Sequence, residues 1–210
     1  MKKVQIVFGG ILLCLVVVVL NSCTPIPIVT IEWQEDGNGF IQFQTNDPEN
    51  ASQGFHILYS STDYNPMTIL EPVEVIVNKV VGSVGGGYGI VFCAYDDQNY
   101  YKILISRAGV YKISKVIGGT DNVIREWDYP VNATIYTGLD KPNKIQVARQ
   151  HPAGSFTVSL NNVQEPTFVD TTLTGGRSGF YVNVSDVSSE YFPASMVDVR
   201  FQMLSPDTIP

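Results

Sequence analysis

The chain is poor in the side chains that build metal, thiol and nucleic-acid sites. Its 210 residues include 3 Cys, 2 His and 13 Lys plus Arg, and only 16% are charged. His56 and His151 have no Cys or His at ligand spacing, which argues against zinc. The net charge is −7 and no basic cluster follows Met1–Lys3, so we expect no nucleic-acid partner. The chain also lacks a Gly-x-Ser-x-Gly nucleophile motif.

No long stretch of the chain shows helical periodicity. Its apolar segments are short and are separated by Gly, Asn, Asp and Pro. Tyr (11), Phe (10) and Gly (18) are plentiful, as in antiparallel β-proteins. We therefore predict an all-β fold, a two-sheet antiparallel sandwich or a barrel. The expected strands are Ile28–Gln34, Gly39–Thr45, Phe55–Tyr59, Val73–Val80, Tyr88–Tyr95, Tyr100–Ser106, Val110–Val116, Asn143–Arg149, Ser155–Leu160, Ser178–Val184 and Met196–Met203.

The N-terminus has the pattern of a secretion signal. Lys2 and Lys3 precede an apolar run, Val7 to Leu20, that is shorter than the ~20 residues of a membrane span. Leu20-Asn21-Ser22-Cys23 then resembles a bacterial lipobox, which implies cleavage before Cys23 and lipidation of its sulfur. A plain anchor helix with an incidental Cys is the alternative.

The lipoprotein interpretation divides the chain into four parts. Residues 1–22 are a signal peptide that contains the signal helix, 23–29 a lipidated tether, 30–205 the β-sandwich and 206–210 a C-terminal tail. The expected location is the cell envelope, with the domain outside the cytoplasm and the membrane as a partner through Cys23. Thr24 is compatible with outer-membrane sorting where the host has an outer membrane. Only Cys93 then remains as a thiol, and we expect it to be buried and inert.

The centre of the chain predicts a three-stranded meander. Asp96-Asp97-Gln98-Asn99 has the composition of a turn, and Arg107-Ala108-Gly109 offers a glycine for positive φ. In the strand Tyr100–Ser106, the side chains of Tyr101, Ile103 and Ile105 share one face because strand side chains alternate. Tyr100, Lys102 and Leu104 share the other face.

This meander and several later segments resemble the concanavalin A-like lectin/glucanase jelly rolls, and most closely the laminin-G-like bacterial subset. The resemblance covers roughly residues 30–203. It implies two curved antiparallel sheets with a jelly-roll connection, and a ligand on the concave sheet or on rim loops. The matching segments are Gly87–Phe92, Tyr95–Tyr101, Ile105-Ser106, Gly109–Tyr111, Pro142–Val147, Ser155–Asn162, Gly175–Phe180 and Val197–Phe201.

A glycosidase needs two suitably spaced carboxyl groups. Glucanases that the chain resembles carry Glu-x-Asp-x-x-Glu on one strand, and this chain has no such string. The nearest approach, Glu71-Pro72-Val73-Glu74, puts its two glutamates on opposite faces of a strand. The sequence therefore favours a protein that is not an enzyme, although carboxylates from separate strands leave the question open.

Aromatic side chains are the candidate ligand contacts, because sugar C–H faces stack on Trp and Tyr. We select Trp127, Tyr129, Trp33 and Tyr191, for which core packing is the alternative role. Asp96 and Asp97 are weak calcium candidates, since oxygen-rich turns suit hard cations but also form without metal. We expect no other cofactor.

The sequence leads to one functional hypothesis and two alternatives. The hypothesis is a membrane-anchored lipoprotein with a non-catalytic β-sandwich module that binds extracellular carbohydrate or a surface partner. The alternatives are a glycoside hydrolase-like enzyme of the same fold and a purely structural or interaction lipoprotein. Ligand identity and oligomeric state stay open.

The anchor is directly testable. Replacing Cys23→Ser removes the sulfur that would carry lipid, and more than one acyl chain is needed for stable anchoring. We expect the wild type in the detergent phase of a phase-partitioning assay and the Cys23→Ser variant in the aqueous phase. A matched Ser22→Gly variant keeps Cys23 and should partition like the wild type. Equal partitioning of Cys23→Ser and the wild type would contradict the lipoprotein interpretation.

Overall fold

The computed structural model describes residues 31–35, 40–45, 54–59, 72–81, 86–127, 134–150, 154–184 and 197–204. None of them is helical, so this part of the chain contains no helix that could cross a membrane. The expected signal peptide, tether and C-terminal tail lie outside the described residues, and the domain boundaries stay predictions. The strands are β1 (Ile31–Glu35), β2 (Ile41–Thr45), β3 (Gly54–Tyr59), β4 (Val73–Val81), β5 (Tyr88–Asp96), β6 (Asn99–Ile105), β7 (Tyr111–Ile117), β8 (Thr120–Trp127), β9 (Asn143–Gln150), β10 (Ser155–Leu160), β11 (Val163–Gln164), β12 (Phe168–Val169), β13 (Arg177–Val184) and β14 (Val197–Met203).

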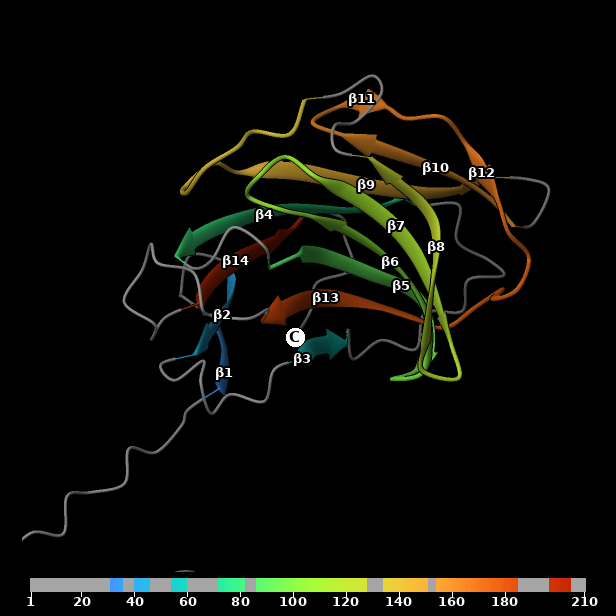
Figure 1. The fold of residues 1–210 in the computed structure, drawn as a ribbon, viewed down its shortest axis with the longest axis horizontal. Coiled ribbons are helices and arrows are strands. Elements are labelled where there is room, and N and C mark those ends of the chain that lie inside the picture. The colour runs from blue at the N-terminus through green and yellow to red at the C-terminus, as the bar shows by residue number, and fades with distance from the viewer. Residues whose placement is uncertain are drawn as a thin grey trace, which may run out of the picture.

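These strands form two antiparallel sheets, as the sequence predicts (Figure 1). One sheet has the order β1-β2-β14-β4-β9-β10-β11, with β12 also paired to β10. The other is six-stranded, in the order β3-β13-β5-β6-β7-β8. Strands from the beginning, middle and end of the chain thus lie side by side in both sheets, which is the crossed connectivity of a jelly roll.

The main core lies between the two sheets and is rich in aromatic rings. Phe180 of the six-stranded sheet stacks on Phe201 of the other, with ring centroids 4.7 Å apart. Phe92 and Phe156 form a second contact between the sheets at 5.4 Å. All four rings are almost fully buried. Removing such a ring costs about 3–5 kcal/mol in other cores, so these contacts hold the layers together.

The turn expected after β6 is present, and a second tight turn follows β10. Asn161 and Asn162 both have positive φ (49° and 68°) in the turn that follows β10, where an L-residue other than Asn or Gly would be strained. Gly109 has φ 89° in the connection between β6 and β7. These positions set the register of the hairpins, and with it the face on which each side chain lies.

The structure adds three strands that the sequence did not predict, namely β8, β11 and β12. The most important is β8, which pairs along β7 and is the outermost strand of the six-stranded sheet. Its charged residues hide the apolar alternation of a strand, and charges are common on edge strands because they discourage pairing with other chains.

A polar network holds the segment after β12 against the sandwich. The Asp170 carboxylate accepts hydrogen bonds from Tyr101 Oη at 2.7 Å, Lys115 Nζ at 2.7 Å and the backbone N–H of Thr172 at 2.8 Å. Tyr101 Oη in turn accepts from the backbone N–H of Leu173 at 3.1 Å. Burial alone would raise the pKa of Asp170, but these donors outweigh it and hold the pKa well below its usual value.

This network predicts sensitivity to acid. A carboxyl whose pKa is lowered by folding stabilises the protein above its unfolded pKa of about 4, and this contribution is lost as the pH falls below that value. We expect Asp170→Asn to lower the free energy of unfolding at pH 7 by about 1–3 kcal/mol and to flatten its pH dependence below about pH 4. Urea denaturation between pH 3 and 7 measures both, with the exposed Asp140→Asn as a control. An Asp170→Asn curve parallel to the wild type would contradict this role.

Candidate functional site

The six-stranded sheet carries apolar side chains on both faces. One face supplies half of the main core, and we call the opposite one the outer face. On the outer face a second cluster gathers side chains from β5, β6, β7 and β13, all of them buried. Its members are Val91, Ala94, Tyr100, Leu104, Val116 and Tyr181. Burial raises the pKa of Tyr100 to about 12 and also raises the pKa of Tyr181, so both phenols stay neutral at pH 7.

A nearly buried lysine lies beside this cluster. Lys102 is 5% exposed, and its Nζ lies 2.9 Å from Asp121 Oδ2. The same ammonium lies over the Tyr181 ring, 5.0 Å from its centroid. A cation this deep in a protein needs such partners, because removing an ammonium from water costs several kcal/mol.

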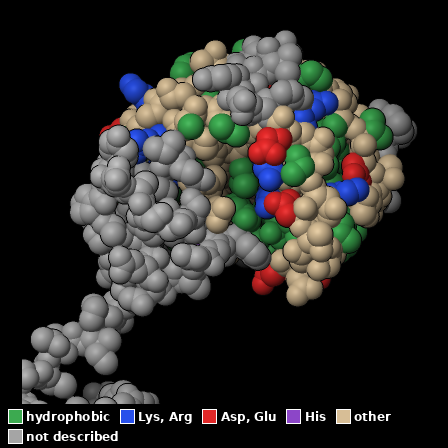
Figure 2. Space-filling model, in the orientation of Figure 1, with side chains coloured by type: hydrophobic (Ala, Val, Ile, Leu, Met, Phe, Trp, Pro, Cys, Tyr) green, Lys and Arg blue, Asp and Glu red, His purple; other side chains and the backbone are tan. Residues whose placement is uncertain are grey.

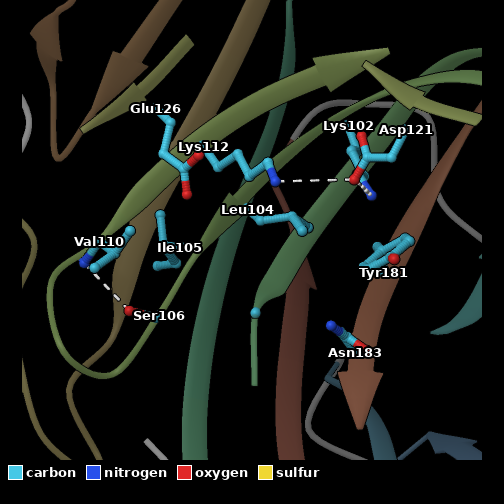
Figure 3. A pocket seen from close by; sticks show the side chains of 11 residues that line it. Lys102, Leu104, Ile105, Ser106, Val110, Lys112, Asp121, Glu126, Tyr181 and Asn183 are labelled. Carbon is cyan, nitrogen blue, oxygen red and sulfur yellow. Dashed lines mark hydrogen bonds and ion pairs between the residues drawn. The ribbon is translucent and has the colours of Figure 1, made fainter. Parts of the chain in front are cut away.

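A second lysine shares the same carboxylate. Lys112 Nζ lies 3.9 Å from Asp121 Oδ2, and Figure 3 shows both lysines reaching Asp121 from different strands. The side chain of Asp121 is 41% exposed and that of Lys112 is 28% exposed. Asp121 therefore joins the buried ammonium to the solvent-facing edge of the site.

Strand register explains why these groups meet. Lys102 on β6 is opposite Ser114 on β7, and Asp121 on β8 is opposite Val116 of the same strand β7. Lys102 must therefore extend across β7 to reach β8. The small Ser114 at the crossing point leaves room for the lysine side chain to do so.

These residues line a pocket of about 230 Å³ on the outer face. Leu104 and Val110 give it an apolar wall, and Asn183 of β13 lies at its other end (Figure 3). Figure 2 shows the corresponding surface, with acidic and basic side chains grouped beside hydrophobic ones. The pocket thus combines an apolar wall with charged and amide groups.

A glycine sets the close spacing of two strands of this sheet. In the register of the sheet, Gly89 lies between Tyr181 and Leu104. A Cβ at Gly89 would be 2.0 Å from the carbonyl oxygen of Ile103, so the strands could not pack as they do with a larger residue. The close spacing of β5 and β6 at this point therefore depends on glycine.

The polar groups around the pocket offer both hydrogen-bond donors and acceptors. Lys112 is opposite Glu126 in the β7–β8 register, and Glu126 also lines the pocket. Ammonium groups donate, carboxylates accept, and the amide of Asn183 does both. With two lysines and two carboxylates among the described lining residues, their formal charges sum to zero.

Of the four aromatic residues selected from the sequence, Trp33 is the one whose side chain the structure describes. Trp33 is half-buried and packs on the main core, 5.0 Å from the Phe43 ring and 5.9 Å from the Phe201 ring. Trp127 ends β8 and is opposite Tyr111 in the register. Tyr129 and Tyr191 lie outside the described residues. The ligand-binding roles of all four stay predictions.

The turn between β5 and β6 supplies its own partners for Asp96. The Asp96 carboxylate accepts from the backbone N–H of Gln98 at 2.8 Å and from the Asn99 side chain at 2.9 Å. These hydrogen bonds lower the pKa of Asp96. Asp97, the other calcium candidate, is exposed, and the described residues contain no group of three or more His, Cys, Asp or Glu placed to hold a metal ion.

The one cysteine among the described residues is not a candidate nucleophile. Cys93 is buried, as the sequence predicts, and burial raises the pKa of its thiol to about 11. A thiol reacts as its thiolate, which is scarce at pH 7 for such a pKa.

The sequence predicted the side of the pocket that β6 supplies, but not the side that β8 supplies. Alternation in the strand Tyr100–Ser106 placed Lys102 and Leu104 on the same face, as observed. Asp121 and Glu126 were missed because β8 was not predicted. The Gly118-Gly119 pair was an available signal for β8, since both glycines have positive φ in the tight turn that leads into it.

Comparison with known proteins supports the fold. No family model matches the chain, and no curated protein matches it. Among solved structures, it is similar to the carbohydrate binding module CBM66 from Bacillus subtilis, with 17% identity and a TM-score of 0.58 over 82% of this chain and 89% of that one. A protein of unknown function with a galectin-like fold from Bacillus subtilis matches with 11% identity and a TM-score of 0.51, over 83% of this chain and 84% of that one.

A third similar structure is the GH43 protein BlXynB from Bacillus licheniformis, with 12% identity and a TM-score of 0.51. The match covers 82% of this chain but only 34% of BlXynB. At these identities the likeness concerns the fold. The described strands, their order in two sheets and these neighbours together show a concanavalin A-like jelly-roll β-sandwich.

Proposed function

We propose that the chain is a lipid-anchored module that binds extracellular carbohydrate in the outer-face pocket without chemically changing it. The observation that carries the proposal is the pocket itself, in which an apolar wall faces charged donors and acceptors on one sheet of a jelly roll. The fold it shares with a carbohydrate binding module supports the same interpretation.

Sugar rings suit such a pocket because they present two kinds of surface. Their C–H groups can contact Leu104 and Val110, and the removal of apolar area from water contributes about 25 cal/mol per Å² to binding. Their hydroxyls both donate and accept, and can bond to Asn183 and Glu126. Hydrogen bonds to charged groups are the stronger ones, at about 1.5–3 kcal/mol each.

The non-catalytic part of the proposal rests on how Asp121 is bonded. A glycosidase needs two carboxyl groups available to the scissile bond and its water. Asp121 Oδ2 is bonded to Lys102 and is close to Lys112, which commits it to organising the pocket. The pocket then offers Glu126 alone as an uncommitted carboxylate among its described lining residues.

Anchoring at Cys23 would hold this module near a membrane surface. Two prolines, Pro25 and Pro27, favour an extended and short connection. Many copies on one surface would then bind a polymeric glycan together, and such multivalency can raise apparent affinity by a factor of about 10² or more. Weak binding at a single small pocket is therefore compatible with useful retention of a glycan.

A glycan array tests the proposal, using residues 24–210 so that the lipid anchor does not interfere. We expect binding by the wild type and at least a tenfold loss in Asn183→Ala and Glu126→Gln, about 1.4 kcal/mol each. Trp127→Ala, run beside them, tests the aromatic platform predicted from the sequence.

The control is Glu74→Gln, which changes a carboxylate in the same way on the other sheet, where Glu74 pairs with Lys144 at 2.6 Å. It should bind like the wild type. Absence of binding to every glycan would contradict the proposal, and release of shortened or free sugars from a bound glycan would show an enzyme instead.

A further inference from the structure

We infer that the outer-face pocket selects a single uncharged sugar ring over acidic sugars, amino sugars and internal stretches of a chain. The inference rests on the proposed function and specifies its ligand class. Three properties of the pocket carry it, namely its size, its balance of charge and the aliphatic nature of its wall.

The size of the pocket limits the ligand to about one ring. Its volume of about 230 Å³ lies below the roughly 300–1,000 Å³ of typical small-molecule sites. Ser106 and Val110 enclose one end, where the Val110 N–H donates to Ser106 Oγ at 3.2 Å (Figure 3). A chain of several sugars would have most of its rings outside the pocket.

The charge of the pocket favours a neutral ligand. Lys102 and Lys112 are balanced by Asp121 and Glu126 among the described lining residues, and Lys102 is nearly buried. A carboxylate or ammonium on the ligand would give the pocket a net charge, because the four charged side chains of the described lining already sum to zero. A net charge in a partly desolvated site is costly, whereas hydroxyls can use the existing charges as hydrogen-bond partners.

The wall of the pocket is aliphatic rather than aromatic. The one aromatic residue among those lining it, Tyr181, is 3% exposed and has Lys102 over its ring at 5.0 Å. Leu104 and Val110 therefore form the apolar contact. A single ring can fit between such a wall and the polar side chains. The described lining does not offer the flat aromatic surface on which a long chain could stack.

Calorimetric titration of residues 24–210 tests ligand class directly. The neutral probes are the methyl glycosides of glucose, galactose, mannose and xylose, together with fructose. The charged probes are glucuronate, galacturonate and glucosamine. We expect at least one neutral monosaccharide to bind, and every charged probe to bind at least tenfold more weakly than its neutral counterpart.

Charge-shifting variants test the physical reason. Glu126→Gln leaves the pocket one unit more positive, and should raise the affinity for glucuronate or galacturonate relative to the neutral sugar by about threefold or more. Lys112→Gln leaves the pocket one unit more negative, and should raise the affinity for glucosamine relative to the neutral sugar by about threefold or more. The control Glu74→Gln, on the other sheet, should leave every ratio unchanged.

The outcomes separate this inference from the proposed function. If an acidic or amino sugar binds the wild type as tightly as its neutral counterpart, the charge argument is wrong while carbohydrate binding stands. If only oligosaccharides bind and no monosaccharide competes with them, the single-ring inference is wrong. If no saccharide binds at all, the proposed function itself is contradicted.

Discussion

The period-two alternation of the six-stranded sheet is the constraint on which the site depends. In β6, Tyr101 and Ile103 enter the main core while Lys102 and Leu104 lie on the outer face. A shift of one residue would exchange the two faces and put the lysine among aromatic rings. Burying that charge without Asp121 would cost several kcal/mol, so the core and the pocket specify the same register.

This shared register also gives the polar groups their fixed positions. Lys102 is held by Asp121 on one side and by the Tyr181 ring on the other, which orders the carboxylate without any contact from a ligand. Buried ion pairs contribute little net stability, but removing one partner costs about 3–5 kcal/mol. Their value is therefore in preorganisation, because a ligand that meets fixed groups loses less free energy on binding.

The fold was more predictable than the site, and β8 explains the difference. Core strands such as β5 and β6 are apolar on one or both faces, so their existence and their turns could be predicted from local patterns. β8 has only one sheet neighbour, so solvent rather than packing selects many of its residues, and its charged side chains conceal its strand character. The pocket needs Asp121 from this strand, and no local rule pairs it with Lys102, 19 positions earlier. The sequence also does not distinguish a tryptophan that packs from one that binds sugar. Trp33 is half-buried and packs on Phe43, and a sugar-binding tryptophan would have the same sequence pattern.

The most direct test of the central claim is to map where a sugar contacts the protein. Backbone amide chemical shifts of isotope-labelled residues 24–210 should be followed while a binding methyl glycoside is added. The account predicts that the largest shifts fall on the outer face of the six-stranded sheet, at Lys102, Asp121 and Asn183. Shifts centred on the opposite sheet, around Lys144 and Arg200, with those three amides unmoved, would contradict it.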